Sequence, residues 1–306
     1  MEYEGQICRA PMERASFMLP VMVGCSYNRC KFCNLFRHLK YRELPLEQIE
    51  GELKRVAEAG GKPGKIFLGD GNAFGLNTER LSEILDLIHR YFPDCMCINM
   101  DATVTSILKK TDRELEMLYR QGVRHLYIGI ESGLSDVLTF MDKDHNLAQA
   151  YEAVERLKKT GLIFDAHIMT GVAGKGRGQE NAVAMAEFFH RTKPAHVVNF
   201  SMFLHREVPL FTHIKDGSFV PADELECLKE ERTLLSMLDT ELSYDGFHDF
   251  IEVRVRGKLP ADREKMLGKL DSVIEKYEKQ EPVYSYVQGE CPDIEKCDGQ
   301  GKIWTI

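Results

Sequence analysis

Short apolar runs alternate with amphipathic stretches from about residue 16 to residue 200. Six of the runs have the length of buried strands: SFMLPVMV (16–23), KIFL (65–68), CMCINM (95–100), HLYIGI (125–130), FDAHIM (164–169) and HVVNF (196–200). Most are continuously apolar, which is typical of strands covered on both faces. A helix or long loop between successive strands favours a parallel sheet with right-handed crossovers. The pattern predicts an α/β fold and fits a doubly wound sheet and a complete or partial barrel equally well.

The amphipathic stretches predict the helices of this fold, at residues 45–61, 78–92, 112–122, 147–161 and 179–192. After residue 200 the alternation ends, and two further helices are predicted at 222–238 and 261–279. No internal repeat or linker marks a second independent domain. We therefore expect a core of residues 1–200 and a C-terminal extension of residues 201–306 that packs on this core.

Composition narrows the class of protein. The chain has 306 residues, 43% of them apolar and 29% charged, as in ordinary globular proteins. No apolar run approaches the roughly 18 residues of a membrane span, and the acidic N-terminus has no signal or transit pattern. A cytoplasmic protein without a membrane partner is expected. The net charge of −8 argues against broad binding to a phosphate backbone, although a basic stretch at 29–42 leaves docking of a peptide or tRNA open.

Three cysteines, Cys25, Cys30 and Cys33, follow the first predicted strand. The chain has nine cysteines, an odd number, and the others are scattered, which does not fit a disulfide framework. Clustered thiols indicate a metal. Zinc would take His38 as its fourth ligand, completing C-x4-C-x2-C-x4-H. A cubane iron–sulfur cluster would be held through three of its irons, with the fourth open to another ligand. The spacing alone leaves both sites open.

The context of these cysteines resembles the radical S-adenosylmethionine (SAM) superfamily. The cysteine loop follows the first strand of a βα series, and an aromatic residue, Phe32, precedes the last cysteine. IGIESG (128–133), at the end of the fourth strand, is similar to the family's IGxESG element. The C-x4-C-x2-C spacing is one residue longer than the family's common C-x3-C-x2-C. The resemblance covers most of residues 16–275. In its later part, the chain resembles short members of the superfamily that are related to oxygen-independent coproporphyrinogen oxidase.

This resemblance implies a partial (β/α)6 TIM-like barrel with a C-terminal α+β extension that covers the barrel opening. It also implies a radical SAM enzyme with two cofactors, a [4Fe-4S] cluster held by the three cysteines and SAM. Reductive cleavage of SAM would yield a 5′-deoxyadenosyl radical, which abstracts hydrogen from a small or medium-sized organic substrate. The electron donor would be a protein such as flavodoxin or ferredoxin. The alternative is a non-catalytic zinc or iron–sulfur module, which has no use for IGIESG.

The resemblance also places SAM-binding residues at the C-terminal ends of the strands, where barrel active sites lie. GDGNAFG (69–75) occupies the position of the family's Gly-Gly-Glu-like segment, with Asn72 and backbone carbonyls replacing the Glu. Glu131 would reach the ribose or the methionine portion of SAM. The other residues expected to bind the cofactor are Phe32, Gly69, Asp70, Gly71, Asn99, Asp101, Gly171 and Lys175.

Several residues outside these motifs carry weaker expectations. Candidate substrate contacts lie in the covering region, at His205, Arg206, His248 and Asp249. Cys95 and Cys97 are expected to share one face of the third strand and to pack there. Cys291 and Cys297 are too few for a second cluster. Only 24 residues precede Cys25, so neither an N-terminal cobalamin-binding domain nor the extra three-cysteine domain of a methylthiotransferase is expected.

Overall fold

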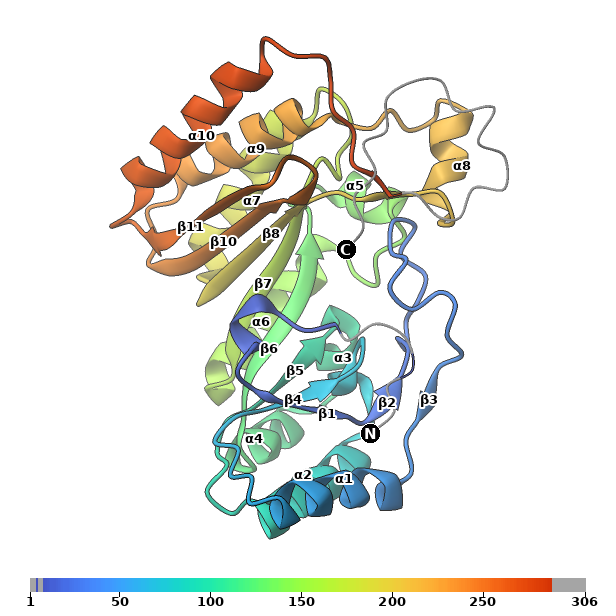
Figure 1. The fold of residues 1–306 in the computed structure, drawn as a ribbon. Coiled ribbons are helices and arrows are strands. Elements are labelled where there is room, and N and C mark those ends of the chain that lie inside the picture. The colour runs from blue at the N-terminus through green and yellow to red at the C-terminus, as the bar shows by residue number, and fades with distance from the viewer. Residues whose placement is uncertain (1–3, 5–7, 288–306) are drawn as a thin grey trace.

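An open sheet of eight strands forms the centre of the computed structural model, which describes residue 4 and residues 8–287 (Figure 1). In spatial order the strands are β1 (Phe17–Pro20), β4 (Ile66–Gly69), β5 (Ile98–Ala102), β6 (Val123–Glu131), β7 (Ile163–Thr170), β8 (His196–Ser201), β10 (Leu242–His248) and β11 (Val253–Leu259). Every neighbouring pair is parallel except β10 and β11, which are antiparallel. The end strands β1 and β11 do not pair with each other, so within the described residues the barrel is not closed.

The six strands predicted from the apolar runs are β1 and β4 to β8, which confirms the open partial barrel. Pro20 ends β1 at the sheet edge, where its missing N–H costs no ladder hydrogen bond. The hairpin of β10 and β11 belongs to the predicted α+β extension, for which no strand had been placed at particular residues, and it lengthens the sheet beyond six strands. Cys95 and Cys97 precede β5, so the prediction that they share a strand face is wrong.

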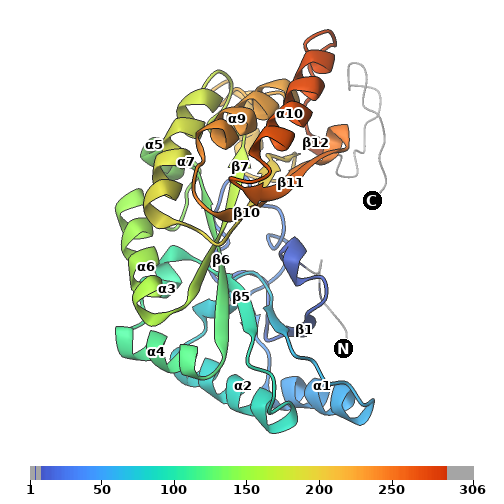
Figure 2. The same ribbon diagram turned by 90° about the vertical axis from the view of Figure 1, so that its left-hand side faces the viewer.

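Helices cover the convex face of the sheet (Figure 2). They are α1 (Leu46–Glu58), α2 (Thr78–Tyr91), α4 (Asp112–Arg120), α6 (Leu147–Thr160), α7 (Gly178–Thr192), α9 (Glu224–Met237) and α10 (Arg263–Tyr277). Their apolar stripes and the outward strand residues, such as Ile66 and Leu126, form one core. Capping boxes begin several helices, as at Thr111 and Glu114 for α4. No helix in the described part of the chain is both long and apolar enough to cross a membrane.

Shorter elements connect the main strands and helices. They are η1 (Pro11–Glu13), β2 (Met22–Val23), β3 (Arg42–Glu43), η2 (Ala73–Gly75), α3 (Val104–Leu108), α5 (Ser135–Phe140), β9 (Leu204–His205), α8 (Leu210–Lys215), η3 (Asp249–Ile251) and β12 (Tyr286–Val287). A second apolar cluster joins α5 to residues 202–219 and includes Val137, Leu210 and Phe219. Phe32 of the cysteine loop packs against this cluster, so part of the C-terminal extension contacts the loop.

The N-terminal η1 lies on the concave face of the sheet, opposite the helices (dark blue in Figure 2). Its Glu13 is fully buried, with one carboxylate oxygen 2.8 Å from Asn99 Nδ2 and 2.9 Å from Lys65 Nζ. The Tyr127 and Ser16 hydroxyls also donate to this carboxylate. Burial acts to raise the pKa of Glu13, but these donors outweigh it and hold the pKa below its usual value. The carboxylate therefore fixes η1 over β4, β5 and β6.

Glu13→Gln is expected to lower the free energy of unfolding by about 3 kcal/mol, because Lys65 loses its anionic partner and a buried amide replaces the acceptor. Urea denaturation near neutral pH measures the change. The stabilisation by the Glu13 carboxylate is present above the ordinary Glu pKa of about 4.5 and is lost as pH falls through the lower folded pKa. The stabilities of the parent protein and of Glu13→Gln should therefore become equal at acid pH. Glu116→Gln on the surface of α4 should change the free energy of unfolding by about 0.5 kcal/mol or less. Equal losses in both variants would contradict the role of Glu13 as the buried anion that fixes η1.

Candidate functional site

The three cysteines lie in the loop between β2 and β3, which is folded by its own backbone contacts. Asn28 adopts a φ of 46° and donates from Nδ2 to the Phe36 carbonyl at 3.0 Å. The guanidinium of Arg37 donates to the carbonyls of Cys33, at 2.8 Å, and Cys30, at 2.6 Å. Arg37 thus holds the two cysteines in one turn while all three thiols remain free.

Three contacts attach this loop to neighbouring segments. The Tyr27 hydroxyl donates to the Asp142 carbonyl at 2.6 Å, and the Lys31 N–H donates to the Met141 carbonyl at 3.0 Å. The Lys31 carbonyl accepts from the Leu210 N–H at 3.1 Å, at the start of α8. The loop is therefore held from the β6–α6 connection and from the C-terminal extension.

The loop offers three free thiols, whereas His38, the fourth ligand that a zinc site would need, is exposed. Among the described residues, no group of three Cys, His, Asp or Glu side chains is arranged to hold a single metal ion. Burial raises the pKa of Cys30 to about 12 and also raises that of Cys33, so metal binding there would displace protons.

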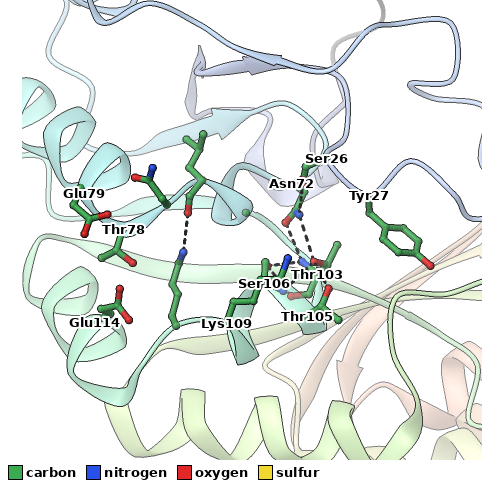
Figure 3. Close-up of a pocket in the computed structure, with 14 residues that line it drawn as sticks. Ser26, Tyr27, Asn72, Thr78, Glu79, Thr103, Thr105, Ser106, Lys109 and Glu114 are labelled. Atoms are coloured by element: carbon green, nitrogen blue, oxygen red, sulfur yellow. Dashed lines mark hydrogen bonds between the residues drawn. The ribbon is translucent and has the colours of Figure 1, made fainter.

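The segment after β4 packs directly on the cysteine loop. Gly71 has a φ of +36°, and a Cβ at this position would lie 2.8 Å from the Gly24 carbonyl oxygen and 2.9 Å from Cys25 Cα. Only glycine permits this approach. Asn72 donates from Nδ2 to Ser26 Oγ at 3.0 Å and accepts from the Thr103 N–H at 3.1 Å (Figure 3). Its amide therefore ties the cysteine loop to the end of β5, so the predicted role of Asn72 toward SAM would fall to the backbone carbonyls.

A cavity of about 370 Å³ adjoins Asn72 (Figure 3). Its other lining residues include Thr78 and Glu79 of α2, Lys109, and Glu114 of α4. Ser26 and Tyr27 of the cysteine loop and Thr103 after β5 also line it, whereas Asp70, Asp101 and Glu131 do not. This cavity is therefore separate from the carboxylates expected to contact SAM.

Two carboxylates, Asp70 after β4 and Asp101 on β5, have no ion pair with a cationic side chain among the described residues. Asp70 is 4% exposed, and its Oδ1 has no hydrogen-bond partner among the described residues. Burial raises the pKa of Asp70 to about 6. Burial, followed by the charges of Asp70 and Glu13, raises the pKa of Asp101 to about 8. Asp70 and Asp101 are thus close enough to repel each other, and a cationic ligand would relieve this repulsion.

Cys8 belongs to the same neighbourhood, although the sequence marked it only as one of the scattered cysteines. Burial raises the pKa of its thiol, and the charges of Asp101 and Cys33 act in the same direction. The N-terminal segment therefore runs from the buried Glu13 to the vicinity of the cysteine loop.

Glu131 ends β6 beside the same loop. Its Oε1 lies 3.1 Å from Lys143 Nζ, and the two side chains are only 12% and 7% exposed. Lys143 also lies over the ring of Phe32, at 5.9 Å. Burial acts to lower the pKa of Lys143, but Cys30 and Glu131 outweigh it and hold the pKa above its usual value. The ion pair thus joins the cysteine loop to the end of β6. Lys143 was not predicted as a site residue, although it lies in the LTFMDKDHN stretch after IGIESG.

A hydrogen-bonded chain holds the end of β6 from the convex side. Asn181 of α7 accepts from Ser132 Oγ at 2.6 Å and from the Gly133 N–H at 3.2 Å, and donates to Glu230 of α9 at 2.6 Å. The other oxygen of Glu230 accepts from the Gly171 N–H at 2.8 Å. Burial raises the pKa of Glu230 to about 7. The extension therefore positions the residues on either side of the site, through two side chains that no sequence pattern marked.

Other predicted residues have contacts of their own within the protein or are exposed. Asn99 is fully buried, and its amide is used by Glu13 and by the His125 N–H. Gly69 packs on Met18, and Lys175 is exposed, with its N–H bonded to the Val220 carbonyl. His248 is fully buried between Glu224 and Glu231 on the convex side, so its prediction as a substrate contact is wrong. Cys291 and Cys297 lie outside the described residues.

Comparison with known families decides which chemistry these residues serve. A model of the Radical SAM superfamily matches residues 19–189, more than half of the chain. The chain belongs to this superfamily. Members of the Radical SAM superfamily use a [4Fe-4S] cluster and SAM, so the predictions of a radical SAM enzyme and of these two cofactors are confirmed.

Relatives within the superfamily are distant. The tRNA-2-methylthio-N(6)-dimethylallyladenosine synthase of Chlorobium luteolum is 25% identical over 53% of this chain and 37% of its own length. The heme chaperone HemW of Buchnera aphidicola is 20% identical over 60% of this chain and 50% of its own length. The chain thus spans half or less of the length of these two curated relatives. Coproporphyrinogen III oxidase (HemN) from Escherichia coli, at 15% identity, has a TM-score of 0.56 over 72% of this chain and 52% of its own, and shares the fold.

Replacing Cys25, Cys30 or Cys33 by Ala is expected to abolish iron binding. The anaerobically purified parent protein should carry about four irons per chain, as one cubane requires. Iron and sulfide analysis with electron paramagnetic resonance measures the loss. Cys95→Ala, at a buried position before β5, should retain the iron. Stoichiometric zinc without iron, or loss of the metal in His38→Ala, would instead support a zinc site.

Asn181→Ala is expected to weaken SAM binding about tenfold, because Ser132 and Gly133 lose the acceptor that fixes the backbone next to Glu131. Calorimetry with cluster-loaded protein measures the affinity. Gln121→Ala is the matched control, since it removes the side-chain hydrogen bonds to Ser82 and Asp86 next to the start of β6, at the opposite end of the strand from Glu131. A similar loss of SAM affinity in both variants would mean that Asn181 acts only through global stability.

Proposed function

We propose that this chain is a radical SAM enzyme that acts on a small or medium-sized organic substrate. The cluster and SAM together supply a 5′-deoxyadenosyl radical, which takes a hydrogen atom from that substrate. The observation that carries the proposal is the arrangement around one loop with three free thiols: Gly71 contacts the loop, while Lys143 links it to Glu131.

Cys25, Cys30 and Cys33 would hold the cluster after losing their protons, and Arg37 keeps their loop in one conformation. Lys143, with its charge beside Cys30, offsets the negative charge of the thiolates. The unpaired oxygen of Asp70 and the neighbouring Asp101 would accept from the amino or ribose hydroxyl groups of SAM. Glu131, fixed by Lys143 and by the chain through Asn181, would contact the ribose or methionine portion.

The apolar cluster of α5 and residues 202–219 supports this assignment. It packs against Phe32 and limits the access of water and oxygen to one side of the cysteine loop. The exposed Arg29 and Lys40 and the half-buried Lys31 form a basic surface on or beside the loop, which would suit an acidic electron donor such as flavodoxin or ferredoxin. Because the thiols are free, we place the enzyme in a reducing compartment, the cytoplasm.

The decisive experiment is anaerobic reconstitution of the cluster, followed by incubation with SAM and dithionite and quantification of 5′-deoxyadenosine. Formation of 5′-deoxyadenosine that depends on Cys30 is expected. A reconstituted protein that binds neither SAM nor its analogues would instead support the non-catalytic module.

SAM affinity is expected to increase as pH rises from about 5.5 to about 8.5. The raised pKa values of Asp70, about 6, and Asp101, about 8, mean that both are protonated at low pH, and a cationic ligand favours their charged forms. Binding should therefore release protons, which calorimetry in buffers of different ionisation enthalpy detects. Asp70→Asn should weaken binding about tenfold at high pH and flatten the lower part of the profile. The exposed Asp94→Asn should keep the parent profile; an unchanged profile in Asp70→Asn would refute the contact.

A further inference from the structure

The concave face of the sheet consists of two unlike halves. Over β4, β5 and β6 it is covered by η1, and Phe67, Asn99 and Tyr127 are at most 1% exposed. Over β7, β8 and β10 the inward Met169, Phe200 and Phe247 are only half-buried. Within the described residues, this second half is left for a ligand.

Register places four side chains in one row across this second half. Met169 pairs with Phe200, Phe200 with Phe247, and Phe247 with Arg254, on β7, β8, β10 and β11. The Phe200 and Phe247 rings are stacked, with centroids 4.9 Å apart and an interplanar angle of 18°. The Arg254 guanidinium lies 4.3 Å from the Phe247 ring centroid. The rings therefore stack on each other along the row, with Phe247 between Phe200 and Arg254, and the row is an apolar ridge that ends in a cation.

Arg254, the cation at the end of the row, has only part of its guanidinium bonded to protein groups. Arg254 donates from Nη2 to Asp245 at 2.9 Å, but its buried Nε has no partner among the described residues. Asp245 also pairs with Arg256 at 2.8 Å and with His196 at 3.2 Å. Two arginines thus share the carboxylate of Asp245, and the charge of Asp249 also acts on Arg254. The Nε of Arg254 nevertheless keeps a donor that no described residue uses, and a guanidinium is suited to a carboxylate.

The other end of the row lies near the SAM-binding end of β6. His167 pairs with Gly129, and a Cβ on Gly129 would lie 2.3 Å from Glu131 Oε1 and 3.2 Å from Lys143 Nζ. The Nε2 of His167 is buried without a partner among the residues that the structure describes. A buried nitrogen of this kind calls for a hydrogen-bond partner. Three strand spacings separate β7 from β11, so the row is about 14 Å long.

We propose that this row binds the substrate, and that the substrate is an elongated, largely apolar molecule of about 14 Å with a carboxylate at one end. The apolar part lies along Met169, Phe200 and Phe247, the carboxylate meets Arg254, and the opposite end reaches His167 beside the Glu131–Lys143 pair. The assignment of this molecule as substrate rests on the proposed function. A single guanidinium at the end of an aromatic surface, on a chain of net charge −8, favours such a molecule over a polynucleotide, which needs several phosphate contacts.

The test uses two fluorescent probes that differ only in charge, pyrene-1-butyrate and pyrene-1-butanol, with the reconstituted full chain. Fluorescence anisotropy should show the butyrate binding about tenfold more tightly than the butanol. Arg254→Gln should remove this difference, whereas Arg120→Gln, at an arginine whose side chain is 79% exposed on α4, should retain it. Phe247→Leu, which keeps Arg254, should weaken both probes by a similar factor.

Equal affinity of the two probes for the parent protein, or loss of the difference in Arg120→Gln, would overturn the inference. If the parent protein retains bulk tRNA and shows no preference for the butyrate, the inference is overturned in favour of a nucleic-acid substrate. Measuring 5′-deoxyadenosine in parallel separates the two proposals. Its formation without probe discrimination refutes only the substrate class, whereas discrimination without 5′-deoxyadenosine refutes the proposed radical chemistry and leaves the anion-binding row in place.

Discussion

The close contact between Gly71 and Cys25 is the constraint on which the site depends. A side chain at position 71 would collide with the backbone of the cysteine loop, so the absence of a Cβ sets how closely β4 and the loop approach. Once they touch, Asn72 reaches both Ser26 and Thr103 and joins three segments. The neighbouring Asp70 is then buried with one carboxylate oxygen that has no hydrogen-bond partner among the described residues. The steric contact at Gly71 thus goes together with the desolvation of a carboxylate, which raises the pKa of Asp70.

Buried charged side chains on the convex side of the sheet fix the positions of its strand ends. Glu224 and Glu231 flank His248 at 2.8 and 3.0 Å, and although burial acts to lower the pKa of His248, these carboxylates raise it to about 10. Glu230, next along α9, leads through Asn181 to the end of β6. Desolvation makes such networks costly unless every member is paired. Here the pairing connects α9 to the end of β6, to Gly171 after β7 and to β10, so the extension contributes to the alignment of these strand ends.

The periodicity of the sequence predicted the core because six strands are buried on both faces and therefore read as apolar runs. The hairpin of β10 and β11 was missed because VRVRGKL alternates apolar and cationic residues, as an antiparallel edge strand does, and interrupts the βα rhythm. The cysteines and Glu131 were found through local motifs. Lys143, Asn181 and Glu230 act through partners on distant elements, and the amides of Asn72 and Asn99 are satisfied by protein groups. Spacing along a chain does not contain that information.

The composition of β11 also bears on how the open sheet avoids unwanted association. An exposed edge offers unpaired backbone groups to any extended chain. Arg254, Arg256 and Lys258 place a cation at every second position of this edge, and Pro260 follows directly after the strand. Another strand aligned here would bring its own side chains against three like charges and meet a residue without an N–H. The edge can therefore remain open beside Phe247 and Arg254 without serving as a template for strand addition.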